Sequence, residues 1–262
     1  MSALVVRNGV KERLARGEVA SSMIVRLTRS GEIAQLAKTA GFDGLYVDLE
    51  HSSLSLETTS QICSAALACG LAAFVRVPQL GLIQRVLDGG ALGVIIPDVR
   101  SAAQAREAVK AAKYPPLGER GFATALPQFR YLSVPTAEQY QVLNDATMVI
   151  VQFESAEAIE RADEIFAVEG VNMALFGTND LTADMGIPGD YENPRVRDAY
   201  ARAIAAAKKH GKYVGVGGLG SRPKLIAQFV NMGARYVSTG SDLGFLLSAA
   251  TESARQVRAF GT

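Results

Sequence analysis

The chain has 262 residues, of which 48% are hydrophobic and 20% are charged, and its 27 Lys and Arg nearly balance its 26 Asp and Glu. This length suits one domain of about 250 residues with a sizeable core. The balanced charge excludes the basic surface typical of nucleic-acid-binding or membrane-attracted proteins. The amino terminus carries charge throughout and shows no secretion signal, and Cys63 and Cys69 match no zinc or redox spacing. We therefore expect a soluble, cytoplasmic protein whose partners are small molecules or copies of itself.

Short apolar runs alternate with Ala-rich amphipathic segments along the chain. The predicted strands are residues 21–27, 43–49, 71–77, 92–97, 147–153, 171–177, 213–217 and 235–240. The predicted helices include residues 31–40, 101–113, 156–168, 195–210 and 222–232. Regular alternation of this kind predicts a parallel sheet, and eight such units close into a (β/α)8 TIM barrel. We expect this barrel to be a single domain over residues 1–262.

Residues 114–146 interrupt the short spacing between the fourth and fifth predicted strands. Their Pro, Gly and aromatic content predicts an ordered excursion rather than a linker. Because we take this segment to leave the carboxyl end of a strand, we expect it to lie over the barrel mouth. The opposite end should be marked by helix-ending glycines, which are Gly41, Gly70, Gly90, Gly211 and Gly233.

Polar side chains follow several predicted strands, at the carboxyl ends that form the catalytic mouth of such barrels. The second strand runs directly into Asp48, Glu50 and His51. The remaining polar residues at strand ends are Arg26, Arg76, Gln152, Glu154, Thr178, Asn179 and Asp180. Since these ends meet at one mouth, we expect the groups to converge.

Glu154 and Asp180 are the candidate metal ligands. Two carboxylates from adjacent strands suit Mg²⁺ or Mn²⁺ and leave positions open for water and a chelating substrate. The alternative for Glu154 is a helix-capping acid. Arg76 beside such a metal would stabilise an enolate oxygen, and its alternative is a pair with a loop acid.

His51 is the candidate general base. It lies three residues after Asp48, close enough for that carboxylate to orient the imidazole and raise its basicity. The alternative is an ordinary loop histidine. The second histidine, His210, lies near a helix carboxyl end, where we expect it to be exposed and stabilised by the helix dipole.

No lysine is expected at the mouth. A Schiff-base aldolase needs a desolvated amine there, whereas the lysines fall on predicted helices or, for Lys212, at the opposite end of a strand. This distribution leaves carbonyl activation to a metal. The Gly-rich residues 215–221 and the loop 239–242 indicate a competing phosphate site, although Arg222 is the only basic side chain nearby.

A series of short motifs spans almost the whole chain. They are D-x-E-H at 48–51, V-R at 75–76, L-D-x-G at 87–90, YPPLGERG at 114–121, Q-x-E at 152–154 and D-L-T-A-D-M-G at 180–186. With these motifs the chain resembles the class II, metal-dependent pyruvate aldolases of the 4-hydroxy-2-oxoheptanedioate and 2-dehydro-3-deoxyglucarate aldolase family, in the wider citrate-lyase β-subunit group. Thr178 and Asn179 depart from the Pro-Ala that is usual there.

The resemblance implies roles for the residues at the mouth. Glu154 and Asp180 would hold a divalent metal such as Mg²⁺, Mn²⁺ or Co²⁺. His51 would be the base, assisted by Asp48, and Arg76 would stabilise the enolate.

The resemblance also implies how pyruvate is held and how subunits assemble. Gln152 and the amides of Asn179 and Asp180 would hold the pyruvate unit. A carboxylate like Asp88 would support the catalytic histidine, but Asp88 ends a helix at the barrel bottom, so we expect that contact from a neighbouring subunit. The apolar segment 242–250 agrees with the implied homohexamer, in which a final helix is exchanged between subunits.

The predicted reaction is reversible aldol cleavage of a 4-hydroxy-2-oxo acid to an aldehyde and pyruvate or a related 2-oxo acid. One alternative is a lyase that acts on a CoA thioester of malyl or citramalyl type, which would need a basic nucleotide cleft. Another is a catalytically silent oligomeric binding protein, which the presence of His51, Glu154 and Asp180 disfavours.

Overall fold

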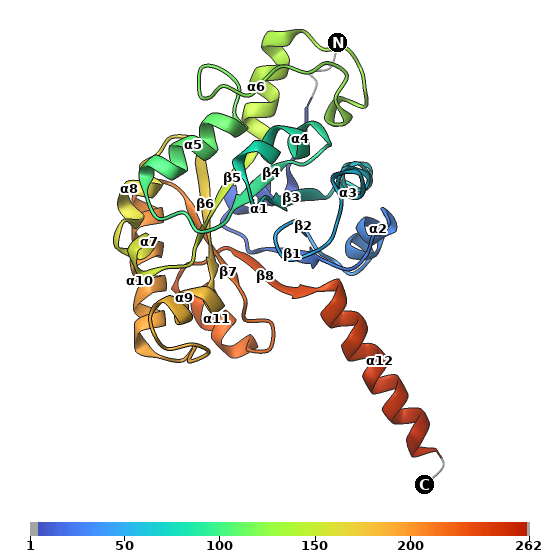
Figure 1. Cartoon of the computed structure of the whole chain (residues 1–262), viewed down its shortest axis with the longest axis vertical. Helices are drawn as coiled ribbons and strands as arrows, with labels where there is room; N and C mark the ends of the chain where they lie inside the picture. Colours follow the sequence, from blue (N-terminus) through green and yellow to red (C-terminus); the bar gives the residue numbers. More distant parts are fainter. Residues whose placement is uncertain (1–4, 261–262) are drawn as a thin grey trace.

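Eight parallel strands form a closed barrel in which each strand pairs with its neighbours in chain order, and β8 closes the ring on β1 (Figure 1). This computed structural model describes residues 5–260. The strands are β1 (Ala20–Val25), β2 (Gly44–Asp48), β3 (Ala72–Arg76), β4 (Gly93–Ile96), β5 (Met148–Phe153), β6 (Val171–Gly177), β7 (Tyr213–Gly217) and β8 (Tyr236–Ser241).

Helices connect the strands, and most of them cover the outside of the barrel. They are α1 (Gly9–Ala15), α2 (Glu32–Thr39), α3 (Leu56–Ala68), α4 (Ile83–Asp88), α5 (Ala102–Ala112), α6 (Thr136–Ala146), α7 (Ala156–Glu160), α8 (Ala162–Phe166), α9 (Thr178–Asp184), α10 (Pro194–Lys209), α11 (Pro223–Met232) and α12 (Asp242–Ala259), with 3-10 turns η1 (Leu80–Leu82) and η2 (Pro127–Phe129). The predicted (β/α)8 barrel is therefore confirmed. The predicted helix 156–168 is divided in two, because Arg161 leaves helical backbone geometry. The glycines predicted to end helices all have positive φ.

Side chains alternate between the inside and the outside of the barrel, because successive strand residues point to opposite faces. Tyr46 and Phe74 belong to the core within the barrel, whereas Val47 packs in the layer between barrel and helices. The next inward position on each strand falls at its carboxyl end. On β2 that position is Asp48 and on β3 it is Arg76, so alternation directs both polar side chains into the mouth.

Helix α1 closes the amino end of the barrel. Val10 and Leu14 of α1 pack against Leu92 in the inner core. Just before the helix, the Nδ2 group of Asn8 donates a hydrogen bond to the backbone oxygen of Ala146 (2.8 Å). Because α1 covers the amino end, the carboxyl end is the open mouth of the barrel.

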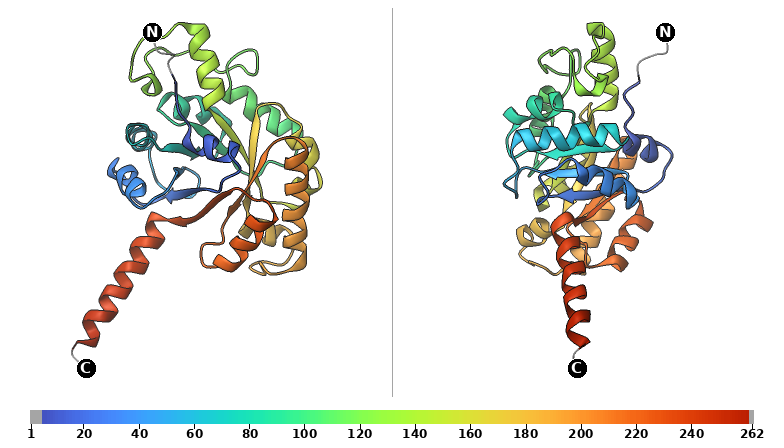
Figure 2. Two further views of the ribbon diagram at one scale, coloured as in Figure 1. Left: turned by 180° about the vertical axis from the view of Figure 1, so that it is seen from behind. Right: turned by 90° about the vertical axis from the view of Figure 1, so that its right-hand side faces the viewer.

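The prediction that residues 114–146 cover the mouth is wrong, because they lie at the amino end. Arg120 Nη2 donates to Asp88 Oδ1 (2.7 Å), and Gln128 Nε2 donates to the backbone oxygen of Leu87 (2.6 Å), both at the end of α4. Figures 1 and 2 show α6 on the same side of the barrel as the amino terminus. The physical reason is that α5 returns the chain to the amino end before the segment begins.

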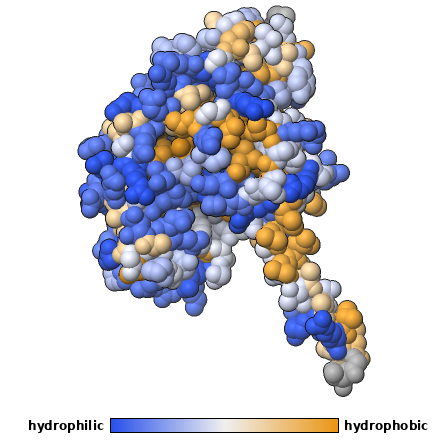
Figure 3. Space-filling view, viewed as in Figure 1, coloured by the Kyte–Doolittle hydropathy of each residue, from blue (hydrophilic) through white to orange (hydrophobic). Residues whose placement is uncertain are grey.

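Helix α12 projects away from the barrel in every view of Figures 1 and 2. Every residue from Leu243 to Phe260 is exposed, and Leu246 and Leu247 are 60% and 63% exposed. Figure 3 shows hydrophobic residues gathered on the part of the projecting helix that lies nearest the barrel. Across residues 5–260, no helix combines the length and the hydropathy needed to span a membrane. Phe245 packs against Phe42, with ring centroids 6.1 Å apart, but the rest of the apolar face of α12 is not covered by its own barrel.

Candidate active site

A cavity of about 400 Å³ opens at the carboxyl end of the barrel. Its walls come from the ends of seven strands, all except β4. The predicted site residues that line it are Asp48, His51, Arg76, Gln152, Glu154, Asn179 and Asp180. The exception is Asp88, which ends α4 at the amino end of the barrel, where Arg120 contacts it. The structure thus brings together every predicted site residue but one.

A buried ion pair joins β2 to β3 at the base of this cavity. Asp48 and Arg76 are register partners on the two strands. Arg76 donates from Nε to Oδ1 (2.9 Å) and from Nη2 to Oδ2 of Asp48 (2.8 Å), and the two side chains are only 9% and 1% exposed. Burial alone would raise the pKa of Asp48, but the hydrogen bonds and charge of Arg76 outweigh it and lower the pKa. This fork-to-fork geometry fixes the guanidinium in one orientation.

The outer edge of the Arg76 guanidinium faces other groups of the mouth. Its Nη1 lies 2.9 Å from Glu50 Oε2 and 3.5 Å from Gln152 Oε1, and the guanidinium carbon is 5.5 Å from the ring centroid of Tyr46. The contact with Gln152 is at the limit of a hydrogen bond. The Nη1 group that faces Gln152 can therefore donate to an oxygen of a bound substrate without reorientation of the guanidinium.

The prediction that Asp48 orients the ring of His51 needs correction. Asp48 Oδ1 accepts the backbone N–H groups of Glu50 (3.0 Å) and His51 (3.2 Å), and the carboxylate is otherwise occupied by Arg76. The carboxylate beside the imidazole is Glu50, whose Oε2 lies 3.9 Å from His51 Nε2. Asp48 therefore shapes the backbone that carries His51, and Glu50 bridges Arg76 and the imidazole.

His210 was predicted to be exposed, but its side chain is only 22% exposed. Its Nε2 lies 3.0 Å from Asp163 Oδ1.

Glu154 lies across the cavity, directly after β5. Its Oε2 accepts the backbone N–H of Asp98 (2.8 Å). A Cβ on residue 177 would collide with the Glu154 carboxyl group, so the end of β6 must be glycine for the carboxylate to fit. Burial raises the pKa of Glu154 to about 7, and the charge of Asp180 adds to that rise, while the Asp98 N–H opposes it.

The pair of Glu154 and Asp180 fits a divalent cation. Burial and mutual repulsion make two ionised carboxylates unfavourable here, and a cation between them would reverse that repulsion. Within residues 5–260 no third His, Cys, Asp or Glu completes a cluster with them. Two carboxylates with further positions left to water and substrate are typical of Mg²⁺ and Mn²⁺ sites.

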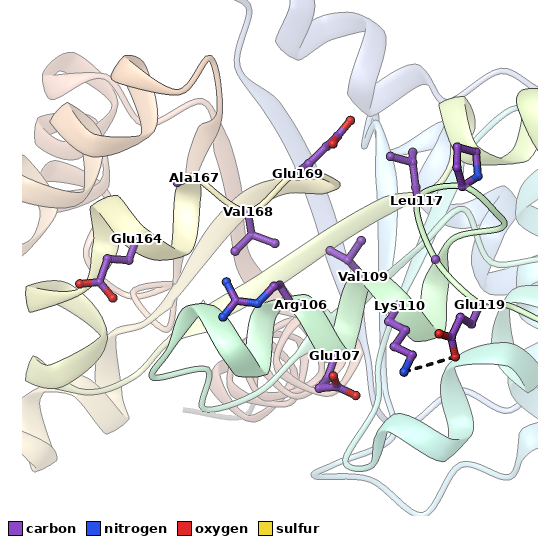
Figure 4. A pocket seen from close by; sticks show the side chains of 12 residues that line it. Arg106, Glu107, Val109, Lys110, Leu117, Glu119, Glu164, Ala167, Val168 and Glu169 are labelled. Carbon is purple, nitrogen blue, oxygen red and sulfur yellow. Dashed lines mark ion pairs between the residues drawn. The ribbon is translucent and has the colours of Figure 1, made fainter.

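A larger cavity, of about 620 Å³, lies outside the barrel wall (Figure 4). It is bordered by α5, the loop that follows it and α8, and an ion pair between Lys110 and Glu119 spans one side (3.3 Å). None of the strand ends contributes to it. Chemistry at the carboxyl ends of the strands therefore belongs to the smaller cavity at the mouth.

Comparison with known proteins agrees with this geometry. The family model described as HpcH/HpaI aldolase/citrate lyase matches residues 22–249. A 4-hydroxy-4-methyl-2-oxoglutarate aldolase of Hapsidospora irregularis is 41% identical over 255 residues, or 95% of this chain and 94% of that protein. A 4-hydroxy-2-oxo-heptane-1,7-dioate aldolase of Escherichia coli is 33% identical over 260 residues, or 98% and 97%. The crystal structure of an HpcH/HpaI aldolase from Desulfitobacterium hafniense DCB-2 superposes with a TM-score of 0.90 at 32% identity, over 96% and 97% of the two chains.

The chain belongs to the HpcH/HpaI aldolase/citrate lyase family. The resemblance inferred from the motifs is confirmed, and membership makes the protein a carbon–carbon lyase. The family is metal-dependent. No lysine lines the mouth cavity among the described residues, as predicted.

This HpcH/HpaI family member has Thr178 and Asn179 where Pro-Ala is usual. Thr178 is buried at the start of α9 and donates from Oγ1 to the backbone oxygen of Gly217 (2.7 Å). Asn179 Oδ1 accepts a hydrogen bond from Tyr191 Oη (2.7 Å). The first N–H groups of a helix have no acceptor within it. Asn179 and Asp180 both line the cavity, so the free N–H groups at the start of α9 lie at the mouth.

The phosphate site considered from the Gly-rich loops is not supported. Residues 217, 218 and 220 do line the mouth. However, Arg222 lies 3.7 Å from Glu192 and over the ring of Tyr191, and it does not line the cavity. The loops lack the basic side chain that would favour a phosphate.

Sequence reasoning missed the partners that position the candidate catalytic groups. It gave no role to Glu50, which contacts Arg76, or to the Asp98 N–H, which contacts Glu154. Asp98 follows β4 and has φ of 47°, and its place after a strand end was the only available signal. A backbone donor carries no residue type by which sequence could identify it.

We predict that replacing Glu154 by Gln stabilises the metal-free protein at high pH. The folded-state pKa of about 7 lies above the ordinary value of 4.5, so the stability linked to this group is present below pH 4.5 and is lost as pH rises through 7. In a chelating buffer, Glu154→Gln should gain about 2.5 kcal/mol over the wild type between pH 5 and pH 8. Urea unfolding at the two pH values measures this difference.

The matched control is Glu160→Gln, which removes an exposed carboxylate at the end of α7. It should show no such gain. Equal pH dependence of unfolding for Glu154→Gln and the wild type would mean that Glu154 is not in a desolvated position.

Proposed function

We propose that the protein is a divalent-metal-dependent aldolase that cleaves a 4-hydroxy-2-oxo acid reversibly to pyruvate, or a related 2-oxo acid, and a second carbonyl compound. One observation carries this proposal: His51, Arg76 and the pair of Glu154 and Asp180 face one cavity that contains no lysine. Both relatives compared above are named for 4-hydroxy-2-oxo diacids. Together these features favour an enolate mechanism without an imine.

The 2-oxo acid end of the substrate would bind on the β5 and β6 side of the mouth. This end would chelate a divalent ion held by Glu154 and Asp180, and the ion would polarise the keto group. Gln152 is buried at the end of β5 and would donate from its amide nitrogen to the carboxylate. The N–H groups of Asn179 and Asp180, at the start of α9, are the further donors for this anionic end.

His51 would move the proton. In cleavage it takes the proton of the C4 hydroxyl, the bond between C3 and C4 breaks, and the electron pair remains on the pyruvate fragment as an enolate. Glu50, 3.9 Å from Nε2, stabilises the imidazolium that forms. The imidazole is 56% exposed, so it can return the proton through water to C3 of the enolate.

Arg76 would stabilise the enolate oxygen. The ion pair with Asp48 holds its guanidinium before substrate arrives, so little reorganisation is needed in the transition state. A lysine could not reproduce this role, because a single ammonium cannot contact Asp48 through two parallel bonds and also face the cavity.

We further propose that the protein assembles as a homohexamer through α12. The exposed apolar side chains of α12, among them Leu246 and Leu247, support packing against a neighbouring barrel. Assembly would also be the route by which Asp88 could approach a catalytic histidine, since the two are at opposite ends of one barrel. The free cysteines Cys63 and Cys69 agree with a reducing compartment such as the cytoplasm.

Charged substitutions on α12 should dissociate the assembly. Light scattering at micromolar concentration should give a multiple of the chain mass for the wild type and a smaller mass for Leu246→Glu/Leu247→Glu, because buried carboxylates cost more than the apolar contact gains. Leu132→Glu, at a similarly exposed apolar residue on another surface, is the control. A monomeric wild type would refute assembly through α12.

Substitution of His51 should impair proton transfer. We expect His51→Ala to lower aldol cleavage by about 10²-fold or more, which is the usual contribution of a positioned general base. Exchange of pyruvate methyl protons in D₂O, followed by NMR, measures the same step without a second substrate. His210→Ala removes the histidine that pairs with Asp163 and should leave exchange unchanged. An unchanged exchange rate in His51→Ala would exclude His51 as the base.

Chelation should abolish cleavage of a 4-hydroxy-2-oxo acid, and Mg²⁺, Mn²⁺ or Co²⁺ should restore it. Glu154→Gln and Asp180→Asn should each behave like the chelated enzyme, whereas Asp198→Asn, on the exposed surface of α10, should not. Borohydride with pyruvate should leave no covalent adduct, because no lysine lines the mouth. Full activity after exhaustive chelation, or a pyruvyl-lysine adduct by mass spectrometry, would contradict the proposed mechanism.

A further inference from the structure

Arg26 is the one positively charged residue of the mouth, among those described, to which the reaction above gives no role. It follows β1 and lines the cavity, with its side chain 41% exposed. Its Nε and Nη2 groups donate to the backbone oxygen of His51 (3.2 and 2.8 Å). The Nη1 group donates no hydrogen bond to any residue within 5–260. One edge of this guanidinium is therefore available to a ligand.

The charge of Arg26 is only partly neutralised within the protein. The nearest carboxylate oxygen is Asp48 Oδ2, at 3.5 Å, but that carboxylate already accepts two hydrogen bonds from Arg76. Glu50, the next acid along the chain, contacts Arg76 as well. On this side of the mouth Arg26 thus contributes a positive charge that an anionic ligand could neutralise.

Barrel order places Arg26 opposite the carboxylates that would hold the 2-oxo acid end. In the ring of eight strands, β1 lies across from β5, and Glu154 and Asp180 follow β5 and β6. His51 and Arg76, after β2 and β3, lie between these two sides. A substrate bound by its 2-oxo acid end on the β5 side would therefore extend past the catalytic groups toward Arg26. The cavity of about 400 Å³ has room for both fragments.

Asp242 holds the backbone at Arg26 in place. Its carboxylate accepts the N–H groups of Arg26 (3.0 Å), Leu27 (3.0 Å), Thr28 (2.7 Å) and Leu243 (2.8 Å). Burial alone would raise the pKa of Asp242, but these backbone donors outweigh it and lower the pKa. The loop that carries Arg26 is thus fixed without substrate, which lowers the cost of ordering it on binding.

We propose that Arg26 is a specificity-determining residue that binds a carboxylate on the carbonyl fragment, the one released beside pyruvate. The preferred substrates are then 4-hydroxy-2-oxo acids with a second carboxylate at the far end, and in synthesis the acceptor is an oxo acid rather than a neutral aldehyde. This inference rests on the proposed function and adds to it the class of the second product.

A neutral polyhydroxylated acceptor fits the mouth less well. The residues with hydroxyl groups that line the mouth are Tyr46, Thr178, Ser238, Thr239 and Ser241. Three of these hydroxyls are already engaged: Thr178 with the backbone oxygen of Gly217 (2.7 Å), Ser238 with Ser22 Oγ (3.0 Å) and Ser241 with the N–H of Gly244 (3.1 Å). Tyr46, which is buried, and Thr239 are left to meet several substrate hydroxyls. A phosphate would need more donors than one guanidinium edge supplies, and Arg222 contacts Glu192 instead.

Binding of two inert ligands tests the inference independently of turnover. 2-Oxoglutarate and 2-oxopentanoate share the 2-oxo acid end and differ in a carboxylate or a methyl group at the far end. With Mg²⁺ present, calorimetry should show that the wild type binds 2-oxoglutarate about 10- to 100-fold more tightly, the range expected for a charge-assisted hydrogen bond. Arg26→Met should bring the ratio of the two dissociation constants close to one, and Arg26→Lys should retain part of it.

The matched control is Arg29→Met. Arg29 is three residues away, contacts Ser53 through its guanidinium and does not line the cavity. This substitution also removes one positive charge from the loop, and it should leave the ratio of the two dissociation constants at its wild-type value. If both variants lower the ratio equally, the general field of the loop and not a contact by Arg26 is responsible, and the inference fails.

Cleavage of a second matched pair gives the functional measure. 4-Hydroxy-4-methyl-2-oxoglutarate yields two pyruvates, whereas 4-hydroxy-4-methyl-2-oxopentanoate yields pyruvate and acetone. The ratio of kcat/KM values should favour the diacid by about 10-fold or more in the wild type and fall by a similar factor in Arg26→Met. Using the ratio removes any general effect of losing the contact between Arg26 and the backbone of His51.

The outcomes separate the two proposals. No cleavage of either substrate by the metal-loaded wild type would refute the proposed function, while the binding ratio would still test Arg26. Cleavage without preference for the diacid would overturn the role of Arg26 and leave the aldolase function intact. A preference for glyceraldehyde or its 3-phosphate over pyruvate as acceptor would also overturn it, in favour of hydroxyl or phosphate recognition.

Discussion

Closure of eight parallel strands into one ring determines the geometry of the mouth. In a closed barrel each strand is paired on both edges, so the registers of all strands are fixed together. Fixed register makes Asp48 the partner of Arg76, although 28 residues separate them along the chain. Alternation along each strand then turns both side chains inward, above Tyr46 and Phe74. The buried ion pair is therefore a product of barrel geometry.

Charged side chains are compensated differently on the two sides of the mouth. Around β2 and β3 the buried charges of Asp48 and Arg76 are paired within the protein, and removing one partner would leave an unpaired charge at a cost of about 3–5 kcal/mol. Around β5 and β6, Glu154 and Asp180 are like charges, and burial raises the pKa of Glu154 to about 7. A cation between them would make up the charge that the protein itself does not supply. The β2–β3 side of the mouth is thus held by contacts within the protein, whereas the β5–β6 side needs a bound cation to balance its charge.

Asp242 connects this mouth to the helix that leaves the barrel. The residue begins α12, and its carboxylate holds the backbone from Arg26 to Thr28 at the end of β1. Asp242 therefore joins the first turn of α12 to the loop that carries Arg26. In the proposed assembly through α12, subunit contact and substrate recognition would share this residue.

Local sequence patterns were sufficient to predict the barrel and nearly all of the polar groups at its mouth. Periodicity located the eight strands, and the rule that parallel strands end at one face brought His51, Arg76, Glu154 and Asp180 together correctly. These inferences depend on local pattern and on a general property of parallel sheets, so no tertiary contact had to be known.

The contacts between these groups could not be predicted from the sequence and are defined by the folded barrel. It paired Asp48 with Arg76 instead of the His51 ring, and it placed residues 114–146 at the amino end of the barrel. It also showed that Gly177 leaves space for Glu154 and that a backbone N–H of Asp98 binds that carboxylate. These contacts depend on strand register, side-chain direction and backbone donors. Such quantities are set by packing across the whole barrel, and neighbouring residue types do not encode them.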